Sequence, residues 1–180
     1  MAITNTRNSF GWLTQLLHWL VALHILGLIA LGWYMVDLSY YDPNYHDSLY
    51  YHKAFGMLAL TLAACKVLWF VFNIQPAPAA PLPPWQEWAS RAAHLLLLGL
   101  MLIIPVGGYF ISTSAGDGID MLGLLEIPAL IDVSDDWRDL AISSHEFLAY
   151  SLLALTGLHA TAALKHQFID RDGTLKRMLW

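Results

Sequence analysis

Eight histidines are the residues of this 180-residue chain whose type and spacing could support chemistry. His145 and His159 are 14 residues apart in one apolar stretch. On a single α-helix they would lie within about 40° of a common face and about 21 Å apart along the axis. An imidazole in such a stretch is a functional candidate, although a single one often only forms a hydrogen bond inside the protein. The spacing therefore predicts two separate sites, provided that other segments supply partners at both depths.

The elements that would carry these histidines are four apolar stretches, at residues 12–36, 51–72, 89–111 and 140–164. Each has at least the roughly 20 residues that cross a hydrocarbon layer of about 30 Å as a helix. Hydrophobic residues make up 57% of the chain and charged residues 13%, against about 25% charged in soluble proteins. The sequence predicts an all-α integral membrane protein, with one domain over residues 1–180 that forms a four-transmembrane-helix bundle.

Partners for both histidines are found at matching depths. His18 lies near the start of the first stretch, at the depth of His159, and His52 opens the second stretch, at the depth of His145. A b-type haem whose two axial positions are filled by the protein needs two facing imidazoles. We therefore expect the pairs His18/His159 and His52/His145 to bind the iron of two haems b. Two glycines beside these ligands would let a flat porphyrin approach the backbone, Gly56 and Gly157.

Charges are distributed unequally over the two sides of the predicted bundle. Seven of the nine Lys and Arg residues fall on the side of the N-terminus, which we call the inner face. Eleven of the 14 Asp and Glu residues fall on the opposite, outer face. By the positive-inside rule, both termini are expected to be cytoplasmic. The outer face keeps two basic residues that could form a local positive spot for an electron donor, Lys53 and Arg138.

The remaining histidines have other predicted roles. His24 is about 120° around its helix from His18, so it is expected to form a hydrogen bond within the bundle or to lie near lipid. His46 falls in a polar outer loop and is expected to be solvated. His94 and His166 lie at the inner end, where they could bind quinone or a haem propionate. Three cations could share that role or simply anchor the inner face: Lys66, Arg91 and Lys165.

Short motifs in a fixed order resemble the bacterial cytochrome b-561 family. They are Leu17-His18-Trp19, His52-Lys53-Ala54-Phe55-Gly56, Arg91-Ala92-Ala93-His94-Leu95, Ile104-Pro105-Val106-Gly107, Gly157-Leu158-His159-Ala160 and Lys165-His166. The likeness covers nearly the whole chain. It implies a multi-pass protein of a bacterial inner membrane, with two b haems on the same four histidines and electron exchange with ubiquinone. One activity of the family is oxidation of periplasmic superoxide with delivery of the electron to ubiquinone.

These observations predict transmembrane electron transfer between a periplasmic donor or acceptor and the ubiquinone pool. The enzyme form would be a superoxide:ubiquinone oxidoreductase, and the alternative is a haem-bearing membrane anchor subunit of a larger redox enzyme. Superoxide is an anion, so the acidic outer face suits a neutral or basic donor better. A histidine-lined transporter is disfavoured, because the mid-depth positions are almost wholly Leu, Ala, Val and Gly. The expected partners are membrane lipid, quinone and an unidentified periplasmic redox partner, with no nucleic acid.

Overall fold

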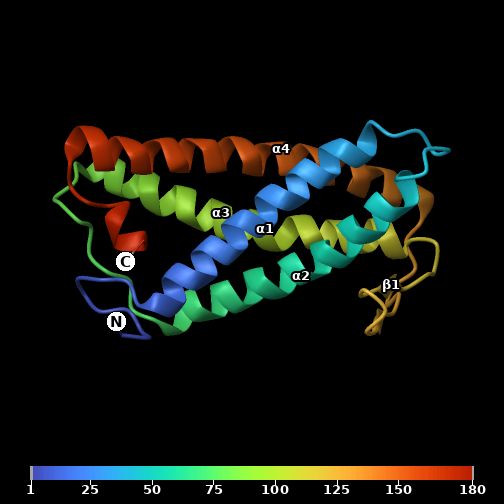
Figure 1. Cartoon of the computed structure of the whole chain (residues 1–180), viewed down its shortest axis with the longest axis horizontal. Helices are drawn as coiled ribbons and strands as arrows, with labels where there is room; N and C mark the ends of the chain where they lie inside the picture. Colours follow the sequence, from blue (N-terminus) through green and yellow to red (C-terminus); the bar gives the residue numbers. More distant parts are fainter. Residues whose placement is uncertain (1, 180) are drawn as a thin grey trace.

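Four long helices make up most of the computed structural model, which describes residues 2–179 (Figure 1). They are α1 (Trp12–Val36), α2 (Tyr45–Phe72), α3 (Pro84–Thr113) and α4 (Asp135–Lys165). A π-helical turn, η1 (His166–Asp170), continues α4, and a 3-10 turn, η2 (Lys176–Met178), follows near the C-terminus. All four long helices are long and apolar enough to cross a membrane. The predicted four-helix membrane architecture is confirmed.

Three of the helices begin earlier than the apolar stretches do. α2 begins at Tyr45 rather than 51, α3 at Pro84 rather than 89, and α4 at Asp135 rather than 140. The added turns carry typical start signals, since proline suits the first turn of a helix and acidic residues favour its positive end. Hydrophobicity marks only the part of a helix that lies in hydrocarbon. It therefore misses the turns that extend into the interface.

The helices pack in chain order. α1 packs against α2, α2 against α3 and α3 against α4, whereas α4 makes few contacts with α1 or α2 over the described residues. The buried core is a small cluster with one residue from each helix, Val21, Ala63, Met101 and Leu152. Direct packing of α4 on α1 and α2 is consequently limited and includes this cluster.

Hydrogen bonds between side chains and neighbouring helices fix α1 against α2. The Nε2 atom of His24 lies 2.9 Å from the carbonyl oxygen of Phe55. Near the inner end, the indole of Trp69 donates to the hydroxyl of Thr14 at 2.8 Å. The prediction that His24 forms a hydrogen bond within the bundle is confirmed, and this residue ties two helices together.

The connection between α3 and α4 forms a small hairpin at the outer end. Its strands are β1 (Ile119–Asp120) and β2 (Glu126–Ile127), which pair antiparallel. Leu122 and Gly123 take positive φ angles of 58° and 74° in the turn. Ile119 is buried, while Leu124 at the turn is 84% exposed. Residues 121–125 therefore form the turn between the two strands. The hairpin packs against the bundle through Ile119 of β1, while the side chain of Leu124 is exposed.

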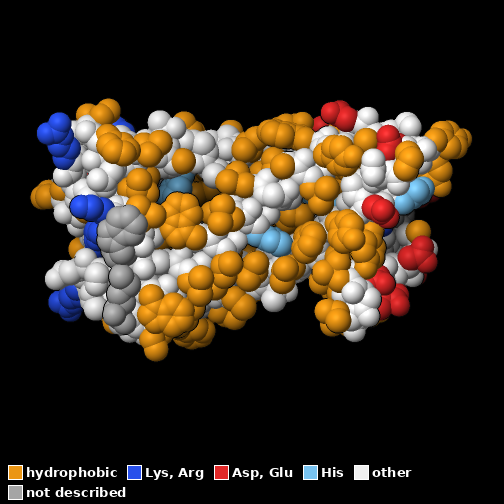
Figure 2. All heavy atoms as spheres, viewed as in Figure 1, with side chains coloured by type: hydrophobic (Ala, Val, Ile, Leu, Met, Phe, Trp, Pro, Cys, Tyr) orange, Lys and Arg blue, Asp and Glu red, His pale blue; other side chains and the backbone are white. Residues whose placement is uncertain are grey.

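Both termini and the α2–α3 linker meet at one end of the bundle (Figure 1). Arg177 donates to the carbonyl oxygens of Ala77 and Asn8, both at 2.9 Å. Trp19 donates from its indole to the carbonyl oxygen of Met178 at 2.8 Å. Figure 2 shows lysines and arginines gathered at this end and acidic residues at the opposite end. The unequal charge distribution expected from the sequence is present on the folded surface.

Candidate functional site

The structure brings together both histidine pairs that the sequence predicts. The ring centroids of His18 on α1 and His159 on α4 are 6.2 Å apart. Those of His52 on α2 and His145 on α4 are 6.3 Å apart. Two imidazoles on opposite sides of one metal ion have centroids about 6 Å apart, because each metal–nitrogen bond is about 2 Å and each ring centre lies about 1 Å beyond. Both separations suit coordination of one iron between two rings.

Each pair bridges two helices that do not pack closely. The inner pair joins α4 to α1 and the outer pair joins α4 to α2, which are the contacts that the bundle largely lacks among residues 2–179. Figure 2 shows a recessed histidine in a hollow between α4 and α1, near the end that carries the lysines and arginines. The core cluster that contains Val21 and Leu152 lies between the two levels. The hollow and the few contacts of α4 with α1 and α2 fit a flat group bound between the imidazoles.

Two glycines leave room for the outer pair. A Cβ atom at Gly108 would lie 3.1 Å from Cε1 of His145, and one at Gly32 would lie 3.4 Å from Cε1 of His52. Gly56 and Gly157, which the sequence analysis selected, have no neighbouring atom within 4 Å of such a Cβ, so they border open space. The sequence analysis missed the first two glycines. In the sequence, these glycines could have been recognised only as small residues on neighbouring helices at the depth of a histidine.

The hydrogen bonds of the outer imidazoles suit ligation through one ring nitrogen. Nδ1 of His145 lies 3.0 Å from the carbonyl oxygen of Ile104, so it is the protonated nitrogen and Nε2 keeps its lone pair. Nδ1 of His52 is buried and has no hydrogen-bond partner in the described residues. A buried polar atom without a partner is uncommon in a histidine that serves only for packing. These observations fit a haem at this level.

The inner pair has two further neighbours. The ring of His94 lies 5.1 Å from that of His159, and its Nδ1 donates to the carbonyl oxygen of Ser90 at 2.7 Å. The ammonium of Lys66 on α2 lies within electrostatic range of His18, His94 and His159. Lys66 lies 14 residues after His52, within about 40° of the same face of α2, whereas Lys53 is about 100° around the helix from His52. The face of α2 that carries the outer ligand therefore carries a cation at the inner level.

The other inner candidates have different partners. Arg91 forms a salt bridge with Glu87, and its side chain is 74% exposed. Lys165 lies 2.6 Å from a carboxylate oxygen of Asp170. Of the five residues proposed for quinone or a propionate, the structure therefore places His94 and Lys66 at the inner histidine pair and gives Arg91 and Lys165 carboxylate partners on the surface.

The fifth candidate, His166, lies in a local cluster after α4. Its Nδ1 is 2.8 Å from Asp172 and 3.1 Å from Asp170. Desolvation raises the pKa of Asp172, but hydrogen bonds from Thr174 and His166 outweigh it, so this pKa lies below its usual value. Asp172 also accepts hydrogen bonds from Thr174 at 2.7 and 2.9 Å. The cluster therefore stabilises the turn that returns the chain toward the bundle.

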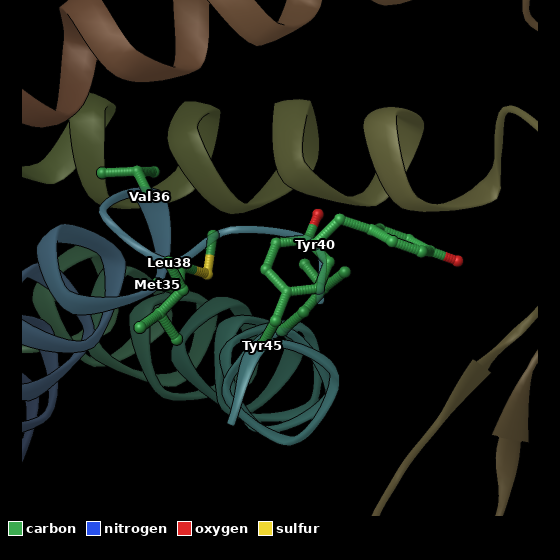
Figure 3. A pocket seen from close by; sticks show the side chains of 6 residues that line it. Met35, Val36, Leu38, Tyr40 and Tyr45 are labelled. Carbon is green, nitrogen blue, oxygen red and sulfur yellow. The ribbon is translucent and has the colours of Figure 1, made fainter. Parts of the chain in front are cut away.

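The outer end has a cavity and two basic residues without acidic partners. Lys53 is half-buried and Arg138 exposed, and neither forms a salt bridge within residues 2–179. The cavity, of about 350 Å³, lies between the end of α1 and the start of α2 (Figure 3). It is lined by Met35, Val36, Leu38, Tyr40, Tyr45 and Leu49. Its lining is mainly apolar, with two tyrosines, and it begins one helical turn outward of Gly32 and His52. The sequence analysis did not predict this cavity.

Comparison with known proteins places these observations in a family. The sequence profile of the family described as prokaryotic cytochrome b561 matches residues 9–180. Cytochrome b561 homolog 2 of Escherichia coli (strain K12) is 41% identical over 179 residues, 99% of this chain and 95% of that protein. The probable superoxide oxidase CybB of Yersinia pestis is 27% identical over 91% of each chain. Cytochrome b561 homolog 1 of Escherichia coli (strain K12) is 26% identical over 96% of this chain and 97% of that protein.

Proposed function

Because the chain belongs to the prokaryotic cytochrome b561 family, whose members are haem-containing membrane electron carriers, we propose that it transfers electrons between a partner at its outer end and ubiquinone at its inner end. The observation that carries this proposal is the arrangement of two histidine pairs on one helix. His145 and His159 of α4 each face a histidine of a different helix, at centroid separations of 6.3 and 6.2 Å. Two redox sites at two depths provide a route across a membrane.

In this proposal, His18 and His159 hold the inner haem b, and His52 and His145 hold the outer one. Each haem, when bound, supplies one-electron redox chemistry. Two histidines per haem would leave no position on the iron for oxygen or another substrate. The hydrogen bond from His145 to the carbonyl of Ile104 fixes the ring and its tautomer.

Charge supports the proposed orientation in the inner membrane. Lysines and arginines gather at the end that holds both termini, as Figure 2 shows, and the positive-inside rule favours a cytoplasmic position for this end. The acidic end then faces the periplasm. It would attract a neutral or basic donor more readily than an anion. The relative from Yersinia pestis is described as a probable superoxide oxidase, so superoxide is the anionic donor to test.

Ubiquinone is proposed to react at the inner end. His94 and Lys66 lie beside the inner histidine pair, where an imidazole and an ammonium could bind a quinone carbonyl or a haem carboxylate. Arg91, Lys165 and His166 already pair with carboxylates, so they would take part only after those pairs separate. We therefore place the quinone contact closer to His94 than to the end of α4.

Electron transfer through the reconstituted protein tests this proposal. The holoprotein would be placed in liposomes that contain ubiquinone, with a membrane-impermeant reductant on the side of the acidic end. His18→Ala should retain the outer haem but reduce quinone at least tenfold more slowly. His24→Ala, which removes only an interhelical hydrogen bond, is the matched control and should act like the unsubstituted protein. Quinone reduction at the full rate in His18→Ala would contradict the route. Reduction by the purified protein alone would also exclude a purely anchoring role.

A further inference from the structure

Lys66 distinguishes the inner histidine pair from the outer pair. We propose that its positive charge raises the reduction potential of the haem held by His18 and His159 above that of the outer haem, and so favours electron flow toward the inner end. This inference rests on the proposed function, since it needs both haem sites. It adds a direction, which the histidine pairs alone leave open.

The position of Lys66 on α2 directs it toward the inner site. Lys66 lies 14 residues after His52, which is the spacing that separates His145 from His159 on α4. At about 100° per residue, this spacing returns to within about 40° of the same helix face, about 21 Å further along. α4 carries a histidine at both levels, whereas α2 carries a histidine at the outer level and a lysine at the inner level. Lys66 therefore lies at the inner level on the face of α2 that carries His52, while His18 of α1 is the partner of His159.

The environment of Lys66 supports an inward role. The side chain of Lys66 is half-buried on α2, and its ammonium is within range of a Coulomb interaction with His18, His94 and His159, which are on three different helices. A lysine that only extended along lipid to the membrane surface would point away from these rings. Lys66 has no hydrogen-bond or salt-bridge partner among residues 2–179. An unpaired ammonium inside a membrane protein is unfavourable, so a nearby negative charge would stabilise it.

A haem at this site could make the environment of the ammonium more favourable in two ways. A haem carboxylate could pair with the ammonium, and the electron added on reduction lowers the positive charge at the iron. A cation near the site favours the reduced state in either case. Coulomb's law gives about a tenfold larger equilibrium constant for reduction when unit charges are about 10 Å apart at the effective dielectric constant of a protein. For a one-electron couple, tenfold corresponds to about 59 mV.

Redox titration of the full-length holoprotein, followed by its haem absorbance, tests the inference. Lys66→Met should lower the midpoint potential of the inner haem by about 59 mV, which corresponds to a tenfold smaller equilibrium constant for reduction. The midpoint potential of the outer haem should stay unchanged. Lys66→Arg keeps the charge and should restore the potential. Lys176→Met removes an exposed cation at the same end and is the matched control. His52→Ala, which keeps only the inner haem, assigns the potentials.

The possible results separate the two proposals. Equal inner potentials in Lys66→Met and the unsubstituted protein, with both haems bound, would overturn the role of Lys66 and leave the haem sites intact. If Lys66→Met lost the inner haem, the midpoint potentials would be measured in two variants that keep Lys66. His52→Ala would give the potential of the inner haem, and His18→Ala that of the outer haem. An inner potential equal to or below the outer one would then overturn the inference. Absence of haem from the unsubstituted protein would instead overturn the proposed function.

Discussion

The imidazoles of His52 and His145 lie 6.3 Å apart, centroid to centroid, on two helices that make few direct contacts in the described structure. Side chains that face each other across such a gap do not hold the helices together by packing. A group between them could do so, because coordination by both rings would join α2 to α4. The second pair, His18 and His159, has the same relationship between α1 and α4. Haem binding would therefore join α4 to α1 and α2 and also supply the redox groups.

Removing one outer histidine should remove one haem. We expect His52→Ala and His145→Ala each to retain about one haem b per chain instead of two, because each haem depends on both of its axial ligands. Haem content per protein, measured by absorbance after purification, checks this. Retention of two low-spin haems in either variant would exclude this assignment of ligands.

A single methyl group at Gly108 should disturb the outer site. Its Cβ would lie 3.1 Å from Cε1 of His145, so Gly108→Ala should displace this ring and lower the occupancy of the outer haem several-fold. Gly99→Ala on the same helix is the matched control, because nothing lies within 4 Å of that Cβ. Haem content and the low-spin spectrum of both variants provide the comparison. Equal occupancy in the two variants would show that His145 tolerates the closer contact.

Loss of the His24 hydrogen bond should affect stability but not haem content. Its ring nitrogen lies 2.9 Å from the carbonyl oxygen of Phe55. Hydrogen bonds between membrane helices contribute about 0.6 kcal/mol on average, with values up to about 1.7 kcal/mol. His24→Leu should therefore lower the free energy of unfolding by about this amount in a detergent titration and keep two haems. A haem deficit in this variant would reveal a role that the structure does not give it.

The spatial pairing of the histidines could be predicted because helix geometry is regular, whereas other features depend on packing. Counting residues from the helix ends was enough to match His18 with His159, since every residue adds the same rise. The contact of Gly108 with His145 depends on how α3 and α4 cross, which no count of residues provides. The ligand roles themselves stay predictions until haem is measured.

The end of α4 shows a second limit of prediction from sequence. Lys165 and His166 were grouped with the inner site because they lie at the inner end of the fourth apolar stretch, where His166 is seven residues beyond His159. The chain instead reverses through Arg171 and Gly173, which have positive φ angles of 56° and 78°. This reversal brings Asp172 to His166. Asp-Arg-Asp-Gly at 170–173 was a readable turn signal, because aspartate and glycine favour such turns.

The turn after α4 should loosen in acid. The pKa of Asp172 is below its ordinary value, so the carboxylate contributes stability above the pKa of the unfolded state, and that stability is lost as pH falls through the lowered folded-state pKa. The protection factors of residues 173–178 against hydrogen exchange, which correct for the intrinsic effect of pH, should fall several-fold over this acid range. Asp172→Asn should exchange faster already at neutral pH and lose most of this pH dependence. Unchanged protection in that variant would mean that other contacts hold the turn.

The most direct test of the account is the optical spectrum of the detergent-purified protein, oxidised and dithionite-reduced, with haem and protein quantified in one sample. The account predicts two haems b per chain and low-spin spectra in both states, because all four axial positions are filled by His18, His52, His145 and His159. One haem per chain, or a high-spin component, would contradict the two-pair assignment. Complete absence of haem would contradict the proposed electron transfer.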